Sequence, residues 1–298
     1  MDIELTRTFL AVEAGGSFIA AAQRLHLTQT AVSARIRTLE HQLGRPLFVR
    51  NKAGARLTPA GERFMRYATS LVQAWERARH QVALPPGRED GLSIGAEASL
   101  WHPLLADWLT WMHRVCPEVA LRATVDHPPP LLDAIQDGAL DLAIVYSPAQ
   151  RPGLVCELLM DEKLVLVSTA TDGRLQPSQY VYVDWGPAFA ANHDGAFPAL
   201  ANPPVSISLG PLALAYLLSV GGCGYFRAGA VRELLADGRL QRVAGAPEFS
   251  HSVYAVYAAR NEHATLARAR DGLRLIAADA EGRPPLPPAH PAKRIKSS

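Results

Sequence analysis

Four polar residues at helical spacing, Gln29, Thr30, Ser33 and Arg37, could contact the edges of DNA bases. Gln forms two hydrogen bonds with adenine, Ser bonds either base, and the methyl group of Thr suits thymine. Arg37 lies further along and could bond guanine or a phosphate. Apolar residues gather on the opposite face of the same predicted helix, at Val32, Ile36, Leu39 and Leu43. With that face packed inward, the polar face is free to enter the major groove.

The segment that carries these residues is the third of three predicted helices. Apolar residues at helical spacing from Leu5 predict the first helix. Ser17 is a good N-cap for the second and Thr28 for the third, and Gly44 suits the left-handed end of the third. The tight turn between the second and third helices predicts a helix-turn-helix unit.

A basic hairpin is predicted to follow. Residues 47–57 have the pattern of two short strands around a turn. Arg50, Lys52 and Arg56 lie on it and suit contacts with the DNA backbone, which set position and affinity more than sequence preference.

A long fourth helix is predicted from about Pro59 to Ala83, with Thr58 as its N-cap. Its apolar residues are spaced alternately by four and three: Phe64, Ala68, Leu71, Trp75, Ala78 and Val82. This heptad pattern favours a helix that pairs with a second copy. A surface helix of a monomer could show the same stripe.

The charge is unevenly distributed. Residues 1–84 hold twelve Lys or Arg and six Asp or Glu, a net charge of +6, whereas the remainder carries −4. A basic head on an acidic body indicates a polyanionic partner for the head. A merely soluble basic surface is the alternative.

After a Pro-Pro-Gly linker at 85–87, predicted strands and helices alternate. The strands are predicted at 92–95, 119–125, 140–146, 164–168, 180–183 and 253–258, and the helices at 100–114, 131–136 and 212–220. This alternation predicts an α/β body with mostly parallel sheets, long enough for two subdomains. The proline-rich and then basic segment 283–298 is expected to be a disordered tail.

Several function classes find no support. No apolar run could cross a bilayer and the first residues lack the features of a secretory signal, so we expect a cytoplasmic protein without membrane contact. The three cysteines and ten histidines form no metal-binding or disulfide spacing, and catalytic motifs are absent. We therefore expect no cofactor, metal or catalytic residue. A solute-binding protein and an enzyme with a fused DNA-binding domain remain as rivals, and turnover on candidate metabolites would identify the enzyme.

A dense set of residues resembles the signature of the LysR family of bacterial transcription regulators. It consists of Ser17-Phe18, Ala21-Ala22, Leu25, Thr28-Gln29, Ala31-Val32-Ser33, Ile36, Leu39-Glu40, Leu43-Gly44, Leu47-Phe48, Arg50 and Leu57 to Gly61. The first ten residues, Ser93 to Ala96 and Trp185 to Pro187 are similar to the HdfR branch of that family. One departure is Ala34, where many relatives carry Arg. Arg35 comes one place later, beside the buried face, so a phosphate contact suits it better than a base contact.

The resemblance extends to the body, at 131–144 and 220–224, and implies the whole architecture. It implies an N-terminal all-α winged helix-turn-helix domain (1–58), a linker and dimerisation helix (59–90), and an α/β effector domain of two subdomains like periplasmic binding proteins (91–282), before the tail. The implied partners are double-stranded DNA, a second copy in a homodimer or homotetramer, and a small-molecule effector. The DNA-binding residues would be Ser17, Phe18, Thr28, Gln29, Thr30, Ser33, Arg35, Arg37, Arg50, Lys52 and Arg56.

The resemblance also implies a ligand cleft between the two subdomains. Its residues would be Ser99, Leu100, Trp101, His127, Pro128, Tyr146, Ser147, Leu209 and Gly210. Helix N-termini bind anions through free N–H groups, yet here Pro128-Pro129-Pro130 and Pro211 occupy them and lack that donor. We therefore expect an apolar effector, or none. Trp101, Trp108 and Trp111 suit a hydrophobic core better than a ligand site.

Overall fold

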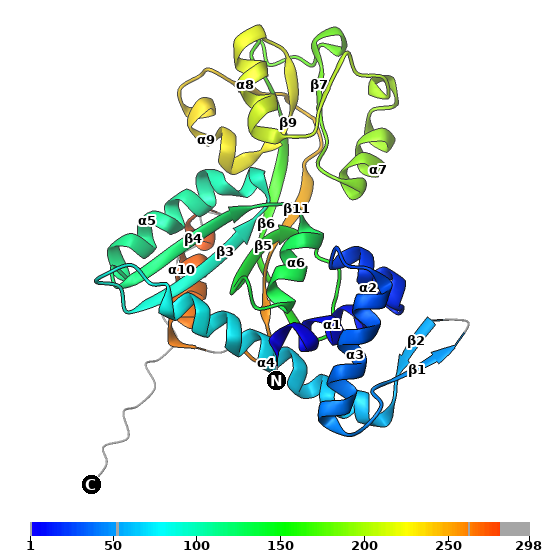
Figure 1. Ribbon diagram of the computed structural model, residues 1–298. Coiled ribbons are helices and arrows are strands. Elements are labelled where there is room, and N and C mark those ends of the chain that lie inside the picture. The colour runs from blue at the N-terminus through cyan, green and yellow to red at the C-terminus, as the bar shows by residue number, and fades with distance from the viewer. Residues whose placement is uncertain (1, 52–53, 262, 281–298) are drawn as a thin grey trace.

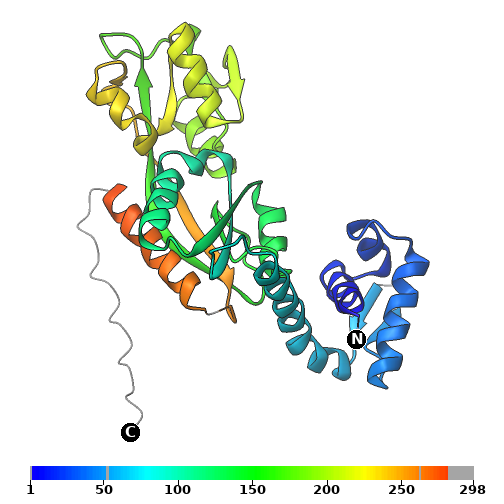
Figure 2. The same ribbon diagram turned by 60° about the vertical axis from the view of Figure 1, so that its left-hand side comes forward.

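The computed structural model describes residues 2–51, 54–261 and 263–280, which form three lobes, the first two of them joined by a long helix (Figure 1). We call them the N-terminal lobe, the proximal lobe and the distal lobe. Figure 2 shows the linking helix α4 as an arm between the N-terminal and proximal lobes. The predicted tail, 283–298, lies outside the described residues.

The N-terminal lobe is three helices and a hairpin. Its elements are α1 (Ile3–Gly15), α2 (Phe18–Arg24), α3 (Gln29–Leu43), β1 (Phe48–Asn51) and β2 (Gly54–Leu57). Ser17 and Thr28 cap α2 and α3 through their side-chain oxygens, and Gly44 ends α3 with a φ of 67°. The rings of Phe9 and Phe48 pack 5.2 Å apart and join α1 to the hairpin. The caps and the hairpin are as the sequence predicts.

Helix α4 (Pro59–Val82) begins at the predicted Thr58 cap. Ala68 and Val72 are fully buried against the rest of the chain, whereas Leu71, Trp75 and Val82 are 37%, 47% and 89% exposed. Most of the predicted heptad stripe is therefore open to a partner.

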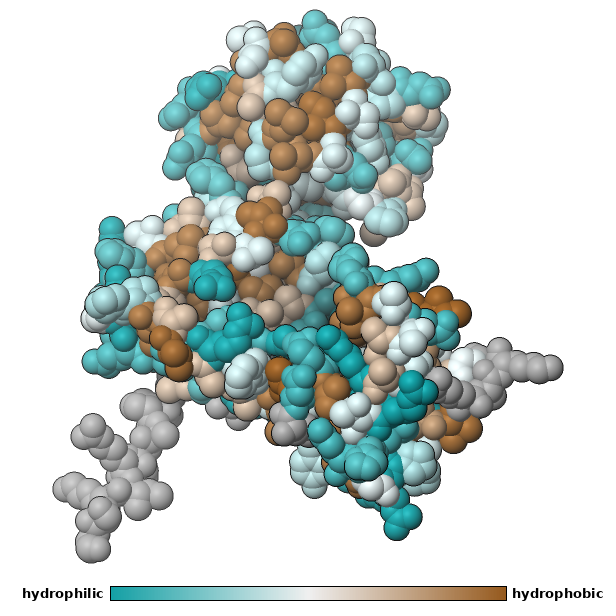
Figure 3. Space-filling view, in the orientation of Figure 1, coloured by the Kyte–Doolittle hydropathy of each residue, from teal (hydrophilic) through white to brown (hydrophobic). Residues whose placement is uncertain are grey.

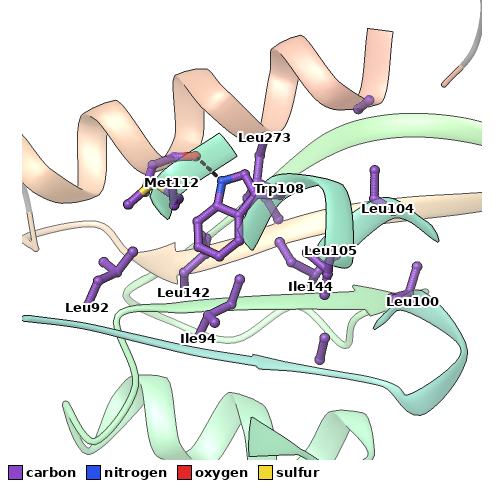
Figure 4. Packing of buried hydrophobic residues seen from close by; sticks show 14 of the residues in the cluster. Leu92, Ile94, Leu100, Leu104, Leu105, Trp108, Met112, Leu142, Ile144 and Leu273 are labelled. Carbon is purple, nitrogen blue, oxygen red and sulfur yellow. Dashed lines mark hydrogen bonds between the residues drawn. The ribbon is translucent and has the colours of Figure 1, made fainter. Parts of the chain in front are cut away.

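The proximal lobe has a sheet with helices on both faces. Its own elements are β3 (Asp90–Ala96), β4 (Val119–Val125), β5 (Leu142–Tyr146), the short turns η1 (Ala98–Leu100) and η2 (Trp101–Leu105), α5 (Ala106–Val115), α6 (Pro128–Gln136) and α10 (Ala264–Ala280). Trp108 is fully buried under α10, and its indole Nε1 donates to the carbonyl oxygen of Ala269 at 2.9 Å (Figure 4). Trp101 and Trp111 pack at the edge of this core, as expected. The helix predicted from residue 100 is regular only from Ala106, because the backbone is extended at His102, ahead of Pro103.

Two long antiparallel strands, β6 (Leu154–Ser168) and β11 (Phe249–Ala258), run from the proximal into the distal lobe. The expectation of mostly parallel sheets is wrong for this reason. Strands β3, β4 and β5 are parallel, but β11 pairs antiparallel with both β5 and β6. The chain crosses between the lobes twice in opposite directions, and alternation of strands and helices does not predict such a crossing.

The distal lobe is built on the far half of β6. Its elements are η3 (Pro177–Gln179), β7 (Val181–Val183), α7 (Pro187–Ala196), η4 (Pro198–Leu200), β8 (Val205–Ile207), α8 (Gly210–Val220), β9 (Cys223–Arg227), α9 (Ala228–Ala236) and β10 (Gln241–Arg242). In its core the hydroxyl of Tyr180 lies 2.8 Å from Nε2 of His193. Hydrophobic residues also reach the surface over α8 (Figure 3), where Leu212 and Val220 are exposed.

Within the described residues, no helix has the length and apolar character needed to cross a membrane.

Candidate nucleic-acid interface and ligand cleft

The outward face of α3 carries the polar residues that the sequence singles out. Gln29, Thr30 and Arg37 are exposed, while Val32 and Ile36 on the opposite face are fully buried. Leu39 is buried with them, but Leu43, expected in the same set, is 40% exposed because it lies in the last turn, beyond the core. Figure 2 shows α3 on the side of the N-terminal lobe that faces away from the other two lobes. A DNA duplex can therefore approach this face freely.

Several of the predicted DNA-binding residues hold the lobe together. The hydroxyl oxygen of Ser17 accepts from the Ala20 amide at 3.1 Å, and that of Thr28 accepts from the Ala31 amide at 3.2 Å. Phe18 is buried. Ser33 is half-buried beside the outward face.

Arg35 points back toward α1 rather than outward. Its Nη1 lies 3.6 Å from Oε2 of Glu4 and donates to the Thr8 hydroxyl at 3.4 Å. This placement agrees with its position beside the buried face.

The hairpin is held against α3 by Glu40. The Glu40 carboxylate accepts from the amides of Leu47, at 2.7 Å, and Phe48, at 3.3 Å. Arg56 is exposed on β2. The side chain of Arg50 and the whole of Lys52 lie outside the described residues. Sequence reasoning quoted Glu40 but missed its role, because the bond joins residues seven and eight positions apart.

A cavity of 550 Å³ lies between the proximal and distal lobes. Of the nine predicted cleft residues, five line it: Ser99, Pro128, Tyr146, Ser147 and Gly210. We call it the ligand cleft. Gly210 begins α8, and the ring of Trp185 packs directly on it. This contact leaves no room for a side chain, so glycine lets α8 begin at this point of the cleft.

The other four predicted cleft residues lie elsewhere. Leu100 is fully buried in the proximal core, and Trp101 packs against that core. His127 lies at the start of α6, exposed, with its Nδ1 2.7 Å from Oδ1 of Asp126. Leu209 precedes α8 and does not line the cavity.

Sequence reasoning missed residues from four other places in the chain. These are Glu97 after β3, the segment from Asp184 to Phe189 at the start of α7, Ser208 after β8, and Ser250, His251, Ser252 and Tyr254 of β11. A Gly-Pro pair after a predicted strand could have indicated the α7 start. Nothing local marks the β11 residues, since they reach the cleft only through the crossing strands.

The cleft is rich in hydrogen-bond acceptors. Oε1 of Glu97 accepts from the Tyr146 amide at 2.7 Å, and burial still raises the pKa of the Glu97 carboxyl. The imidazole of His251 stacks on the Tyr146 ring with centroids 3.8 Å apart. Burial and then the charge of Arg227 lower the pKa of His251 to about 4, so its ring is neutral near pH 7.

The polarity of the lining departs from the apolar effector expected above. Among the described residues that line the cleft, Glu97 and Asp184 are acidic and none is Lys or Arg. Five serines also line the cleft: Ser99, Ser147, Ser208, Ser250 and Ser252. Proline does remove donors at three helix starts, but Glu97, Asp184 and the side chains of β11 make the cleft polar all the same.

Family models match both halves of the chain. The model described as "Bacterial regulatory helix-turn-helix protein, lysR family" matches residues 3–62, and that described as "LysR substrate binding domain" matches residues 86–273. The chain belongs to the LysR family. It is a LysR-type transcriptional regulator. The fold class expected from the sequence is therefore confirmed.

Individual relatives support this assignment. The HTH-type transcriptional regulator HdfR of Salmonella schwarzengrund is 35% identical over 260 residues, 86% of this chain and 92% of HdfR. Full-length LysG from Corynebacterium glutamicum, solved with bound effector Arg, has a TM-score of 0.56 at 20% identity and covers 94% of this chain and 99% of its own. DarR from Vibrio fischeri, solved in complex with DNA, has a TM-score of 0.55 at 19% identity and covers 92% of this chain and 98% of its own. These two likenesses show a shared LysR fold.

Proposed function

We propose that this LysR-family regulator recognises its operator through the outward face of α3. The single observation that carries the proposal is the division of α3 into a buried apolar face and an exposed face bearing Gln29, Thr30 and Arg37. Gln29 and Arg37 have the hydrogen-bonding groups for adenine and guanine, and Thr30 has a methyl group for thymine. Arg56 on the hairpin supplies affinity through phosphates.

Two copies would occupy one operator. The exposed apolar residues Leu71, Trp75 and Val82 of α4 form a continuous stripe, and pairing with a second copy would remove it from water. Two N-terminal lobes held by such a pair would bind two half-sites related by a dyad.

The ligand cleft would hold the effector. Because the described lining residues include Glu97 and Asp184 but no Lys or Arg, we infer a small polar ligand that offers hydrogen-bond donors and positive charge. The Arg bound by LysG is a ligand of that kind. Ligand-dependent movement of the two lobes would then alter DNA binding.

We further infer that the protein acts in the cytoplasm, where a bacterial operator lies, and that it regulates without turning over its ligand. The family consists of transcription regulators. Detectable turnover of a bound metabolite would overturn this inference.

Selection of DNA from a random library by the purified chain tests the central proposal. We expect enrichment of sites made of two related half-sites. The Gln29→Ala variant should enrich sites with relaxed preference within each half-site. Failure of the folded wild-type chain to enrich any sequence would contradict the proposal.

A further inference from the structure

A second cavity, of 280 Å³, lies where the N-terminal lobe, α4 and the proximal lobe meet. We call it the junction cavity. Its walls are mainly apolar and come from all three parts, with Leu10 and Ala14 of α1, Met65 of α4, and Leu154 and Ala259 of the proximal lobe. It shares no lining residue with the ligand cleft. It is therefore a separate site for a small molecule with an apolar body.

Two arginines of the junction cavity are already paired with carboxylates. Arg7 bonds Glu4 at 2.7 Å, and it also bonds Glu76. Arg24 lies 3.3 Å from Oδ1 of Asp133. These pairs hold the N-terminal lobe to α4 and to α6, and their charge is largely neutralised.

Two other arginines, Arg66 and Arg260, have no carboxylate within ion-pair distance in the described part of the chain. They lie close together, since Nη1 of Arg260 donates to the backbone carbonyl of Arg66 at 2.7 Å. Glu13 and Asp137 are the carboxylates of the lining; Asp137 is 3.8 Å from Arg24, and Glu13 forms no ion pair among the described residues. Two unpaired arginines against one unpaired carboxylate leave a net positive charge beside the apolar walls. Guanidinium groups bind carboxylate, phosphate or sulfate through paired hydrogen bonds.

Pairing of two copies through the exposed stripe of α4 would leave the junction cavity accessible. Successive helical residues are about 100° apart, so Met65, Thr69 and Gln73 lie on one side of α4. Tyr67, Leu71 and Trp75, which are exposed, lie on the other. A partner bound to the exposed stripe therefore does not cover the face of α4 that lines the cavity.

We propose that the junction cavity binds a small amphipathic anion. Its anionic head lies between Arg66 and Arg260, and its hydrocarbon body packs against α1, α4 and the start of β6. Such a ligand contacts the N-terminal and proximal lobes at once. Binding therefore stabilises their present arrangement and changes DNA affinity through thermodynamic linkage. This regulation is additional to the effector proposed for the ligand cleft.

Titration calorimetry of the full chain with octanoate tests the proposal, with octylamine as the matched cation of equal chain length. We expect octanoate to bind and octylamine to bind at least about tenfold more weakly, as expected for loss of charge-assisted hydrogen bonds. Equal affinity for the two probes would overturn the assignment of an anion site.

Variants locate the binding. Arg66→Gln combined with Arg260→Gln should weaken octanoate by about tenfold or more, and Ala14→Phe should block it by filling the cavity from α1. Arg63→Gln, an exposed arginine of α4 outside the cavity, is the matched control and should bind as wild type does. If Ala14→Phe fails to fold, the double arginine variant decides alone. Unchanged binding in that variant overturns the proposal.

Two further measurements separate the alternatives. Ser208→Tyr narrows the ligand cleft and should leave octanoate binding unchanged, so a loss there would place the probe in that cleft instead. Saturating octanoate should shift operator affinity of the wild type by at least about threefold and leave the double arginine variant unaffected. If the double variant loses DNA affinity but keeps octanoate affinity, the two arginines bind DNA phosphates and the proposal is overturned.

Discussion

Arg227 and Glu162 form a buried ion pair with 2.6 Å between Nε and Oε2. The same guanidinium donates to the carbonyl oxygens of Ser99 and His102. Arg227 ends β9 in the distal lobe, whereas Ser99 and His102 belong to the proximal lobe. One side chain therefore ties the two lobes together beside the ligand cleft.

Removing one member of this pair should be costly. Glu162→Gln leaves the Arg227 charge buried without its counterion, so the free energy of unfolding should fall by about 3–5 kcal/mol. Glu248→Gln is the matched control, because Glu248 pairs with Arg242 at 2.8 Å on the surface and such a pair contributes about 0–1 kcal/mol. Urea unfolding of both variants measures the difference. Similar losses of unfolding free energy in the two variants would show that burial does not determine how much the Arg227–Glu162 pair stabilises the fold.

The ring of His251 makes stability depend on pH. In the folded chain its pKa is lowered to about 4, whereas an unfolded His titrates near about 6.5. The unfolded state therefore binds a proton first as the pH falls. Stability is full above the unfolded pKa and declines down to about pH 4, by about 2–3 kcal/mol for this residue.

The test compares urea unfolding of wild type and His251→Gln at pH 7 and at pH 5. The wild type should lose more stability between these values than the variant does. His80 and His193, whose pKa values are lowered by burial, act in the same direction and remain in both proteins. His41→Gln, an exposed residue, is the control and should follow the wild type. Equal slopes in wild type and His251→Gln would contradict a neutral buried imidazole.

The N-terminal lobe was largely predictable because its signals are local. Ser17, Thr28 and Thr58 each cap a helix through an amide three residues away, and the inward face of α3 follows from helical spacing. The ligand cleft was only partly predictable. Glu97 and His251 are 154 positions apart and meet through β11, whose pairing with β5 depends on the tertiary fold. Pro128 and Gly210, each at the start of a helix, were predicted because the family resemblance implies a cleft at these positions.

Base recognition by α3 predicts a loss of specificity rather than of general affinity. Gln29→Ala should reduce discrimination between operator and random DNA by about 1–3 kcal/mol. Arg56→Gln on the hairpin should weaken binding to both equally and lower the salt slope by about one. Binding titrations at several salt concentrations distinguish these effects. An equal loss on all sequences for Gln29→Ala would exclude it as a base contact.

The exposed stripe on α4 predicts the oligomeric state. Leu71→Glu with Trp75→Glu would place like charges in the helix pair, so dimers should dissociate and affinity for a two-half-site operator should collapse. Leu71→Met with Trp75→Phe keeps the stripe apolar and should remain dimeric. Sedimentation of the full chain measures both variants. A dimer that survives the double Glu substitution is held by a different surface.

The ligand cleft predicts a preference for cations, which probes of equal length can measure. With Glu97 and Asp184 in its lining and no Lys or Arg among the described lining residues, 1,5-diaminopentane should raise the melting temperature and glutarate should not. Glu97→Gln should reduce the rise, whereas Glu248→Gln should leave it unchanged. Because burial raises the pKa of Glu97, the effect should weaken as the pH falls and the carboxyl becomes neutral. Stabilisation by glutarate alone would instead assign an anionic effector, bound through the helix N-termini despite their prolines.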